Sequence, residues 1–596
     1  MLIGGWGPGA RAVVAGVAGR RRLELTGADG LALAAPPGAL QPAAAGPWRV
    51  WLTGRLTGAP GTAPGDAGPA AAAAAFARSG EDAPAHLTGA YVLVALDAVR
   101  GTAVVCRDHL GARGLHHVTR GADVFFAEHV VDLLELLPAT PAPDRLALVQ
   151  FIDRRALPPG RSLYAGVGRP APGHALILDG TGAAVRSYWR PRCAPSGAST
   201  RAESAERLRH AAFAAIDRAA GDLRAPAVKL SGGLDSACVA AGLAARAPAA
   251  GAAPLALAGV FPAHPESDES PFIEQTAHVS GLELVRVPYV ASPVFGPVRE
   301  YIRRWRLPPP SLNVWLWQPL MTAALVRGVD GVLDGEGGDE LFGASPYLIA
   351  DRLRTGRLHA AWTLAGRLPG LGADADLGLR LAVLRAFGIS GVVPVAAQRW
   401  RRRRRPLRAG VGPFVLDADV PGLLAGVDPW AFKRAGGPLW RADAVWRLVN
   451  GPDGMDAGHL RRDAVDAGLD RRHPFLHDPL LLEGVLALPP EHMFDPARDR
   501  PLLRDALAGV IPESVRTRHA KSFFTALSTE ALAGAEGRTL LEQLASPAAP
   551  VRAYVRPEAL GELGAIATAV GPARDVIAGR LFCLAAVDCW LRELAG

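Results

Sequence analysis

Cysteine is scarce in this sequence of 596 residues. Only five cysteines occur, and no two of them form a CxxC pair. This excludes a disulfide-stapled scaffold and argues against a structural zinc site. No long apolar run is free of Pro and Gly clusters, so we expect no membrane span. The cysteine usage indicates a reducing, cytoplasmic compartment. Residues 1–6 have neither the basic region nor the apolar stretch of a secretion signal.

Lysine is the second scarcity. Only Lys229, Lys433 and Lys521 occur among 65 basic residues, and the rest are arginine. With Ala, Gly and Pro also abundant, this pattern is typical of a GC-rich coding bias. The net charge of +8 is therefore weak evidence for nucleic acid. We interpret the arginine run 399–405, which includes Trp400, as a solvated helix face or a patch for an acidic partner, with no nucleic-acid role.

The overall composition is that of a globular protein. Hydrophobic residues account for 49% of the chain and charged residues for 20%, which excludes a wholly disordered protein. Up to about residue 190, short apolar runs bounded by Gly, Asp and Pro predict a β-rich part. Residues 191–203 have a linker composition. Beyond them, alternating strands and helices predict a parallel, doubly wound sheet, followed by mostly helical sequence. The predicted elements are strands at 225–230, 255–261 and 282–287 and helices at 238–246 and 271–280.

The strongest motif lies at residues 228–236, which read Val-Lys-Leu-Ser-Gly-Gly-Leu-Asp-Ser. A predicted strand runs into a Ser/Gly loop and then into a helix. The glycines let backbone N–H groups approach a ligand, and the hydroxyls and the helix N-terminus favour an anion. Asp235 beside such a site suggests a metal ligand. The motif resembles the SGGxDS pyrophosphate loop of ATP pyrophosphatases, and the alternative is a plain glycine turn.

A second loop, at residues 334–340, reads Asp-Gly-Glu-Gly-Gly-Asp-Glu. It follows the apolar run 331–333, which is another strand end, where α/β sheets bind ligands. Alone it would also fit a glycine turn with solvated acids. Taken with the first loop, it predicts that Asp235 and Asp339 hold Mg²⁺ between them, because Mg²⁺ prefers oxygen ligands together with phosphates.

The two loops together resemble the asparagine synthetase superfamily, over nearly the whole chain. Residues 470–476 resemble its ExRxPFLD segment, with Asp in place of Glu, and residues 501–524 resemble its K.LLR.A and LP..V..R.K..F segments, which places the family lysine at Lys521. The resemblance implies an α/β ATP-pyrophosphatase domain (adenine nucleotide α-hydrolase-like) over residues 204–596, with a parallel sheet and a largely helical C-terminal part. Such enzymes activate a carboxylate as an acyl-adenylate, and a nitrogen nucleophile displaces AMP.

Residues 1–190 resemble the class II glutaminase domain of these enzymes, an α+β sandwich of the Ntn type. Residues 107–115 look like its RDxLGxxPL stretch, and residues 125–128 look like its FASE stretch. The catalytic cysteine that such glutaminases carry after the initiator methionine is replaced by Leu2, and their Asn-Gly pair by Thr53-Gly54. We therefore expect a retained fold without glutaminase chemistry, in which Cys106 is a buried thiol at a strand end rather than a catalytic group.

Without ammonia from glutamine, we expect the nucleophile to be an amine already on the substrate. The routes with inactive glutaminase domains are β-lactam synthetases and lasso-peptide cyclases. β-Lactam synthetases pair a Tyr, in the place of Glu336, with a later Glu, yet this sequence has no glutamate from Leu341 through Leu482. A peptide α-amine has a pKa of about 8, so a strong dedicated base is dispensable. The chain thus most resembles lasso-peptide isopeptide bond-forming (macrolactam) cyclases.

This resemblance implies the substrates, the cofactors and the role of each site residue. ATP would adenylate a side-chain Asp or Glu of a core peptide, and the peptide's N-terminal amine would close a macrolactam ring. The expected partners are a ribosomal precursor peptide, a leader-binding protein and a leader peptidase. The expected roles are adenine contact for Leu230, Gly259 and Val260; pyrophosphate binding for Ser231, Gly232, Gly233 and Ser236; Mg²⁺ binding for Asp235 and Asp339; charge neutralisation at the α-phosphate for Lys521; and completion of the nucleotide site for Asp334, Gly335 and Glu336.

Three other functions stay open. The first is an asparagine-synthetase-like amidotransferase that uses free ammonia or a small amine. The second is a ring-closing small-molecule synthetase of the β-lactam type, and the third is an inactive scaffold that binds nucleotide or a peptide. Trp315 and Trp317, before the second loop, fit either a pocket for an apolar peptide or an ordinary core.

Overall fold

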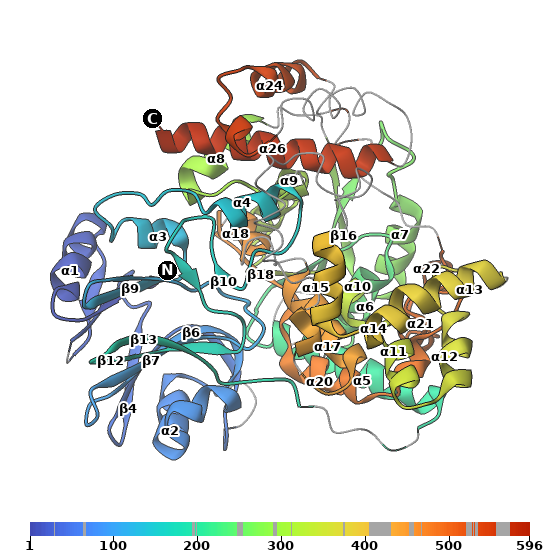
Figure 1. Cartoon of the computed structure of the whole chain (residues 1–596), viewed down its shortest axis with the longest axis horizontal. Coiled ribbons are helices and arrows are strands. Elements are labelled where there is room, and N and C mark those ends of the chain that lie inside the picture. Colours follow the sequence, from blue (N-terminus) through green and yellow to red (C-terminus); the bar gives the residue numbers. More distant parts are fainter. Residues whose placement is uncertain are drawn as a thin grey trace.

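The chain folds into an N-terminal sandwich of two sheets and a larger part built on a parallel sheet (Figure 1). The computed structural model describes residues 1–28, 30–62, 67–192, 197, 199–246, 254–289, 295–311, 313–372, 376–404, 431–434, 436–451, 458–466, 468–519, 527, 530, 534–555 and 573–595. Within these residues no helix is both long enough and apolar enough to span a bilayer.

Two antiparallel sheets form the N-terminal sandwich. The seven-stranded sheet has the order β10-β11-β8-β9-β1-β3-β2 and the six-stranded sheet the order β13-β12-β7-β6-β5-β4. The strands of the first sheet are β1 (Ile3–Trp6), β2 (Glu24–Thr26), β3 (Leu31–Ala35), β8 (His116–Arg120), β9 (Asp123–Ala127), β10 (Gly160–Arg161) and β11 (Gly168–Arg169). Those of the second are β4 (Gln41–Ala45), β5 (Trp48–Gly58), β6 (Thr88–Asp97), β7 (Thr102–Arg107), β12 (His174–Asp179) and β13 (Gly182–Ser187).

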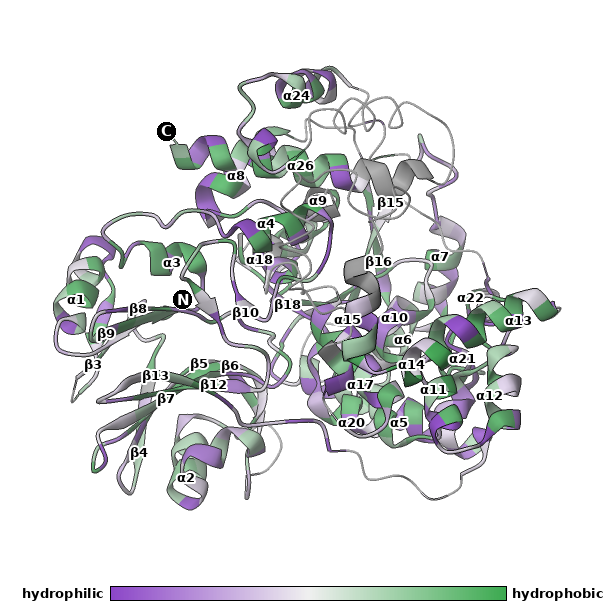
Figure 2. Cartoon of the chain, in the orientation of Figure 1, coloured by the Kyte–Doolittle hydropathy of each residue, from purple (hydrophilic) through white to green (hydrophobic). Residues whose placement is uncertain are grey.

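Three hydrophobic layers hold this sandwich together. Alternate strand residues such as Leu33 and Val94 pack between the two sheets. The outer face of the six-stranded sheet is covered by α2 (Pro69–Ser79), and that of the seven-stranded sheet by α1 (Ala10–Arg21), α3 (Val130–Leu134) and α4 (Arg145–Ile152). Figure 2 shows α3 and α4 as mostly hydrophobic, in agreement with their burial. The N-terminal part therefore has the predicted α+β sandwich of the Ntn type.

A five-stranded parallel sheet forms the centre of the second part, with the order β16-β15-β14-β17-β18. The strands are β14 (Pro226–Lys229), β15 (Leu255–Val260), β16 (Glu283–Pro288), β17 (Gly331–Leu333) and β18 (Asp470–Arg472). Because the chain starts in the middle and moves first to one side and then to the other, the strand order reverses between β14 and β17. Ligands of open α/β sheets bind outside the carboxyl ends of the strands at such a switch point.

Helices cover both faces of this sheet. Val228 and Leu333 face a core shared with α5 (Arg201–Ala220) and α6 (Leu234–Ala244), whereas Ala227 and Val332 face α9 (Asn313–Val326). The other helices near the sheet are α7 (Ser270–Val279), α8 (Phe295–Trp305) and α10 (Gly338–Leu341). The predicted α/β domain with a helical C-terminal part is confirmed.

Two predicted boundaries differ from the structure. Helix α6 begins at Leu234, four residues before the predicted start at residue 238, because the Ser/Gly motif itself forms the helix N-terminus, with Gly233 as the N-cap. Helix α5 begins at Arg201, inside the predicted linker 191–203, because Thr200 and Glu203 form a capping box. The predicted domain limits at residues 190 and 204 remain predictions.

The C-terminal region is helical, as predicted. Its helices are α11 (Leu348–Arg354), α12 (Leu358–Ala365), α13 (Leu377–Val383), α14 (Ser390–Val392), α15 (Val395–Arg404), α17 (Leu439–Asn450), α18 (His459–Asp466), α19 (Pro474–His477), α20 (Pro479–Ala487), α21 (Pro501–Ala506), α22 (Glu513–Arg516), α24 (Ala535–Ala545) and α26 (Ala573–Ala595). The arginine run lies largely on α15, where Trp400 is exposed. The arginine side chains of this run lie outside the described residues, so their role stays a prediction.

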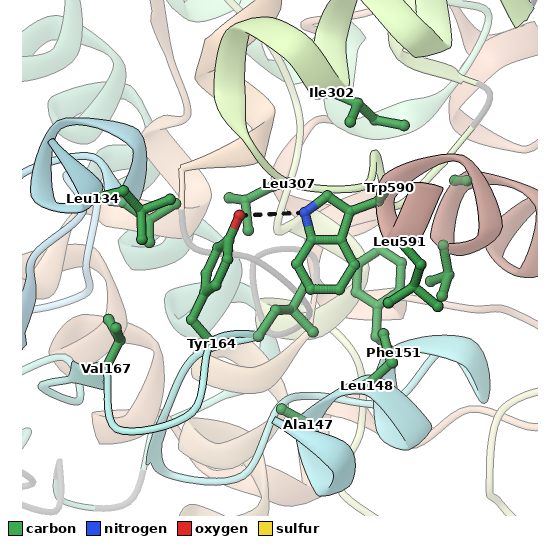
Figure 3. Close-up of a cluster of buried hydrophobic side chains, with 14 of the residues drawn as sticks. Leu134, Ala147, Leu148, Phe151, Tyr164, Val167, Ile302, Leu307, Trp590 and Leu591 are labelled. Carbon is green, nitrogen blue, oxygen red and sulfur yellow. Dashed lines mark hydrogen bonds between the residues drawn. The ribbon is translucent and has the colours of Figure 1, made fainter. Parts of the chain in front are cut away.

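Helix α26 joins the two parts of the molecule. It crosses the top of the view in Figure 1, from the C-terminal region to the N-terminal sandwich. Its buried residues share one core with α1, α4, α8 and the outer face of the seven-stranded sheet. Figure 3 shows the centre of this contact, where Trp590 of α26 packs against Tyr164 and Phe151 of the N-terminal part. The two parts therefore share a continuous hydrophobic core.

Candidate active site

The Ser/Gly loop lies where β14 ends, directly beside the switch point of the sheet. The Ser231 N–H donates to Ser236 Oγ over 3.1 Å, and the Oγ atoms of the two serines are 2.9 Å apart. The Gly233 N–H donates to Ser231 Oγ over 3.3 Å. These contacts fold residues 231–236 into a tight turn at the N-terminus of α6, which is an arrangement suited to an anion.

The side-chain carboxylate of Glu269 contacts this loop. The Gly232 N–H donates to Glu269 Oε2 over 3.0 Å, and Arg518 Nη1 donates to Glu269 Oε1 over 2.8 Å and to the Gly232 carbonyl over 3.0 Å. A Cβ atom at Gly232 would lie 2.9 Å from Glu269 Cβ and 3.1 Å from Phe272 Cβ, so a larger residue here would have to displace these side chains. The loop therefore presents the Gly232 N–H to a carboxylate oxygen, and the same donor fits a phosphate oxygen.

Neither Glu269 nor Arg518 was predicted as a site residue. Arg518 lies in the segment that resembles the family, three residues before Lys521, and that position was an available signal. Glu269 belongs to no motif, and only the tertiary contact with Gly232 reveals it. Lys521 itself lies outside the described residues, so its predicted role stays a prediction.

The second loop packs directly against the first. A Cβ atom at Gly338 would lie 2.5 Å from Asp235 Cγ, and one at Gly335 would lie 2.8 Å from the carbonyl carbon of Asp235. Both glycines are therefore required by the close approach of the two strand-end loops. This packing brings Asp235, on the first turn of α6, beside Asp339, on α10.

A buried arginine joins the two predicted metal ligands. Arg500 Nη1 donates to Asp235 Oδ2 and lies 2.9 Å from Asp339 Oδ1, while Arg500 is only 8% exposed. Burial disfavours the charged guanidinium, but Asp235, Asp339 and Asp499 together raise its pKa above the ordinary value. The two carboxylates thus converge on one point and stabilise a positive charge there.

This arrangement fits a magnesium ion. Mg²⁺ binds to proteins through one or two carboxylates and completes its shell with water and substrate phosphates. Asp235 and Asp339 supply two such oxygens beside the loop that would hold those phosphates. Among the described residues no cluster of three His, Cys, Asp or Glu side chains is placed to hold a metal. A metal at this site would therefore depend on the phosphates of a bound nucleotide.

Asp334 has a different environment from the one predicted for a nucleotide contact. It is fully buried, with Arg471 Nε 2.7 Å from Oδ2 and His473 Nδ1 2.6 Å from Oδ1. Burial alone would raise the pKa of Asp334, but His473, Arg471 and Lys229 hold it well below its usual range. These contacts tie the end of β17 to β18, and they show what the segment at residues 470–476 does in the fold. Contact of Asp334 with a nucleotide stays a prediction.

Lys229 is a further polar residue at the switch point that sequence reasoning left without a role. Its Nζ lies 3.8 Å from Glu336 Oε1, 4.0 Å from Asp334 Oδ2 and 4.6 Å from the ring centre of Trp317. Lys229 is one of only three lysines, which was the available signal. It places a cation between the carboxyl ends of β14 and β17.

The predicted adenine contacts lie on the β15 side of the site. Gly259 and Val260 end β15, and a Cβ at Gly259 would lie 3.5 Å from the Trp317 ring. Leu230 is buried, and its N–H donates to the Leu257 carbonyl over 2.8 Å. Trp317 thus lies at the site as well as against the core, whereas the side chain of Trp315 lies outside the described residues. The roles of these residues toward adenine stay predictions.

The N-terminal sandwich contains no exposed thiol among the described residues. Leu2 is buried between the two sheets, and Arg113 forms an ion pair of 2.7 Å with the buried Glu128 and lies 3.4 Å from Thr53 Oγ1. Gly54 has φ +92° and lies against the carbonyl of Ala90. The described cysteines are all buried, and burial raises the pKa of each; they are Cys106, Cys238, Cys583 and Cys589. None of them fits a thiolate nucleophile.

Two models of protein families match two different stretches of the chain. The model of the asparagine synthase family matches residues 208–576, which is more than half of the chain. The model of the glutamine amidotransferase domain matches residues 70–189. Asparagine synthetase [glutamine-hydrolyzing] 3 of Bacillus subtilis (strain 168) is 22% identical over 456 residues, which cover 74% of this chain and 67% of that protein.

Two solved structures show a weak overall likeness. One is the allosteric regulatory enzyme of purine biosynthesis, at 13% identity and a TM-score of 0.23, covering 60% of this chain and 78% of that one. The other is glutamine phosphoribosylpyrophosphate amidotransferase from B. subtilis in complex with ADP and GMP, at 11% identity and a TM-score of 0.23, covering 60% of this chain and 79% of that one.

Proposed function

Because the chain belongs to the asparagine synthase family of ATP-dependent carbon–nitrogen ligases, we propose that it is a lasso-peptide macrolactam cyclase. In this proposal, a side-chain carboxylate of a core peptide attacks the α-phosphate of ATP and releases pyrophosphate. The N-terminal amine of the same peptide then attacks the acyl-adenylate, forms an isopeptide bond and releases AMP and a proton. The precursor peptide would reach the enzyme together with a leader-binding protein and a leader peptidase.

One observation carries this proposal. The family contains glutamine-hydrolysing members such as the B. subtilis relative, yet every described cysteine of this chain is buried and has a raised pKa. A glutaminase of this type needs an exposed thiolate. We therefore infer that glutamine is not the nitrogen source, which favours an amine that the substrate already carries.

The residues around the switch point support the adenylation half of the proposal. In the proposed complex, the loop 231–236 would bind the pyrophosphate, and Asp235 and Asp339 would hold Mg²⁺, which would supply positive charge beside the phosphates. Arg500 lies beside both carboxylates and would add a fixed positive charge at the place where the phosphates would bind. Preorganised positive charge of this kind stabilises the charge that develops on the leaving group.

The first experiment tests the nitrogen source. The purified chain is incubated with glutamine, with and without MgATP, and free glutamate is measured. We expect no glutamate above the level of a buffer control. Release of glutamate that follows the protein through purification contradicts the inactive-glutaminase proposal.

The second experiment tests ring closure. A panel of linear peptides with Asp or Glu at different distances from a free N-terminal amine is incubated with MgATP. We expect AMP and pyrophosphate in equal amounts and a peptide product that is lighter by one water. The matched control is the same peptide with an acetylated amine, which permits adenylation but not cyclisation. Formation of a primary amide from ammonium in place of the ring identifies the amidotransferase alternative.

A further inference from the structure

A cavity of about 290 Å³ lies between the N-terminal sandwich and the second part of the molecule. On one side it is lined by the β5–β6 pair, including Arg55, and by Arg113. On the other side it is lined by the C-terminal end of α5, including Ala219, by Arg461 of α18 and by Arg472 of β18. Neither part forms this cavity alone, and the predicted nucleotide site does not include it.

Positive charge predominates in the lining. Six arginines but only three aspartates surround the cavity. Arg113 and Arg471 are balanced by acids outside the lining, Glu128 and Asp334. Within the lining, Arg218 forms a two-point ion pair with Asp478, at 2.8 and 3.0 Å. Three arginines then share the remaining two aspartates, which leaves one positive charge in excess.

The remaining five side chains form a chain of ion pairs. Asp222 contacts Arg55 at 3.0 Å and Arg472 at 2.6 Å. Asp470 contacts Arg472 at 2.8 Å and Arg461 at 2.6 Å. The order Arg55–Asp222–Arg472–Asp470–Arg461 therefore begins and ends with an arginine that has only one carboxylate neighbour in the chain.

Two details show that the excess charge is poorly compensated. Burial and the neighbouring Arg472 lower the pKa of Arg55 to about 10. Arg461 Nε is buried and has no hydrogen-bond partner in the part of the chain that the structure describes. A buried charged donor without an acceptor is costly, and such groups are normally satisfied by a ligand or an ordered water.

We propose that this cavity binds one small oxyanion, a carboxylate or a phosphate group, held by Arg55, Arg461 and Arg472. One bound negative charge would balance the lining and would supply an acceptor to Arg461 Nε. Arginine suits this task because its planar fork matches both groups. The site joins the two parts of the molecule, and it gives the N-terminal sandwich a role that needs no glutamine chemistry. It does not depend on the proposed cyclase activity.

Isothermal titration of the full chain with sodium acetate and with inorganic phosphate, at constant ionic strength, tests the proposal. We expect saturable binding of one anion per chain for at least one of the two, and the stronger binder identifies the group. Arg461→Gln removes a donor, and Ala219→Leu fills the cavity while it leaves every arginine in place. Both variants should bind at least tenfold more weakly. Arg246→Gln is the matched control, because Arg246 pairs with Asp217 on the same α5 but does not line the cavity.

Two results would overturn the proposal. The first is that neither acetate nor phosphate binds saturably, which means that the cavity holds only water. The second is that phosphate binding is lost in Ser236→Ala but unchanged in Ala219→Leu, which means that the ion binds at the loop 231–236. Circular dichroism establishes that each variant is folded, and Ala219→Leu remains a test if Arg461→Gln does not fold.

Discussion

At the scale of single residues, Arg500 is the most informative side chain of the candidate site. It has φ +46°, a left-handed conformation that is costly for a residue other than glycine, and it directly precedes α21. Its guanidinium contacts Asp235 and Asp339, which otherwise would repel each other. Arg500 therefore acts as an internal counter-ion at the place where a metal ion fits.

Arg500→Gln should bind Mn²⁺ more tightly than the wild type when no nucleotide is present. The metal no longer has to displace a charge-assisted hydrogen bond, which is worth about 1.5–3 kcal/mol, so we expect an affinity gain of about tenfold or more. Electron paramagnetic resonance of free Mn²⁺ measures it. Arg498→Gln is the control, because Arg498 pairs with Asp495 and Asp505 instead. Unchanged affinity in a folded Arg500→Gln protein refutes the counter-ion role.

Lys521 leads to a separate prediction at this scale. A compact ammonium can meet a single phosphate oxygen in a tight site, whereas a guanidinium is bulkier and prefers a two-point contact. Lys521→Arg should therefore be nearly as damaging as Lys521→Ala, with a loss of about 3 kcal/mol, or about a hundredfold, mainly in kcat. Steady-state AMP release with a linear peptide that the enzyme cyclises measures it. Near-normal turnover of Lys521→Arg means that only the charge matters.

At the scale of secondary-structure elements, the site depends on how closely two strand-end loops approach each other. The loops follow β14 and β17, which are neighbours in the parallel sheet. Gly335 and Gly338 permit the contact, since a Cβ at either position would overlap Asp235. The glycines of the second motif thus allow the two loops to pack together. They affect the predicted metal ligands only by letting Asp235 keep its position.

Gly338→Ala should displace the Asp235 carboxylate and reduce pyrophosphate release by about a hundredfold or more, because charge stabilisation at the leaving group depends on its position. The overall fold should remain, since Asp235 is a short side chain at a helix terminus. Gly296→Ala is the control, because it has open space at its Cβ on α8. Full activity of a folded Gly338→Ala protein would mean that Asp235 need not hold this position.

Helix α26 is the element that connects the C-terminal region to the N-terminal sandwich. Trp590 Nε1 donates to the Arg306 carbonyl over 2.9 Å and lies 3.3 Å from Tyr164 Oη, as Figure 3 shows for the second contact. Arg306 has φ +56°, so these hydrogen bonds support a strained turn after α8. One indole therefore connects the C-terminal helix, the end of α8 and the N-terminal sandwich.

Substitution of Trp590 separates packing from hydrogen bonding. Trp590→Ala should reduce the free energy of unfolding by about 3–5 kcal/mol, as expected for a buried aromatic side chain. Trp590→Phe keeps most of the ring but loses the donor to Arg306, and we expect a loss of about 1–2 kcal/mol beyond the smaller ring volume. Urea unfolding measures both. If both variants lost the same free energy of unfolding, the hydrogen bond and not the packing of the ring would dominate the contribution of Trp590.

At the scale of the whole molecule, we expect acid stability to depend on buried histidines at the N-terminal sandwich. Burial lowers the pKa of His109 to about 4 and that of His129 to about 3. His109 packs against Tyr188 and Trp189, and His129 packs against Trp305 of α8. Between pH 6.5 and 4 the unfolded chain binds protons at these positions that the folded chain does not.

Stability should therefore fall as the pH falls from about 6.5. For His109 alone, a change in pKa from 6.5 to about 4 lowers the free energy of unfolding by about 2 kcal/mol at pH 5 relative to pH 8. His109→Phe keeps the aromatic contacts, and it should flatten this slope in urea unfolding at both pH values. The exposed His210 supplies the control variant His210→Phe. An unchanged slope in His109→Phe would show that His109 does not cause the acid sensitivity.

The sequence by itself determined the class of fold and the positions of the two strand-end loops, residues 231–236 and 334–340, that form the candidate site. Parallel strands read as short apolar runs, and their carboxyl ends meet at one edge, so Asp235 and Asp339 could be paired without coordinates. The scarcity of lysine marked Lys229 and Lys521, but it could not give Lys229 its neighbours. The sequence predicts the start of α6 four residues too late, because glycine and serine in the motif favour a loop and only the structure shows that Gly233 caps a helix.

Only the tertiary structure decided what surrounds these loops. Arg500 is 265 residues from Asp235, and Glu269 and Arg518 reach the loop from separate elements, so no local pattern could join them. The arginine-lined cavity likewise requires β5, α5, α18 and β18 to come together. Local sequence fixes which residues form a strand or a turn, because those preferences act over a few neighbours. Which distant charges meet in a buried site depends on how the elements pack, because there a cation must find its carboxylates or pay the cost of desolvation.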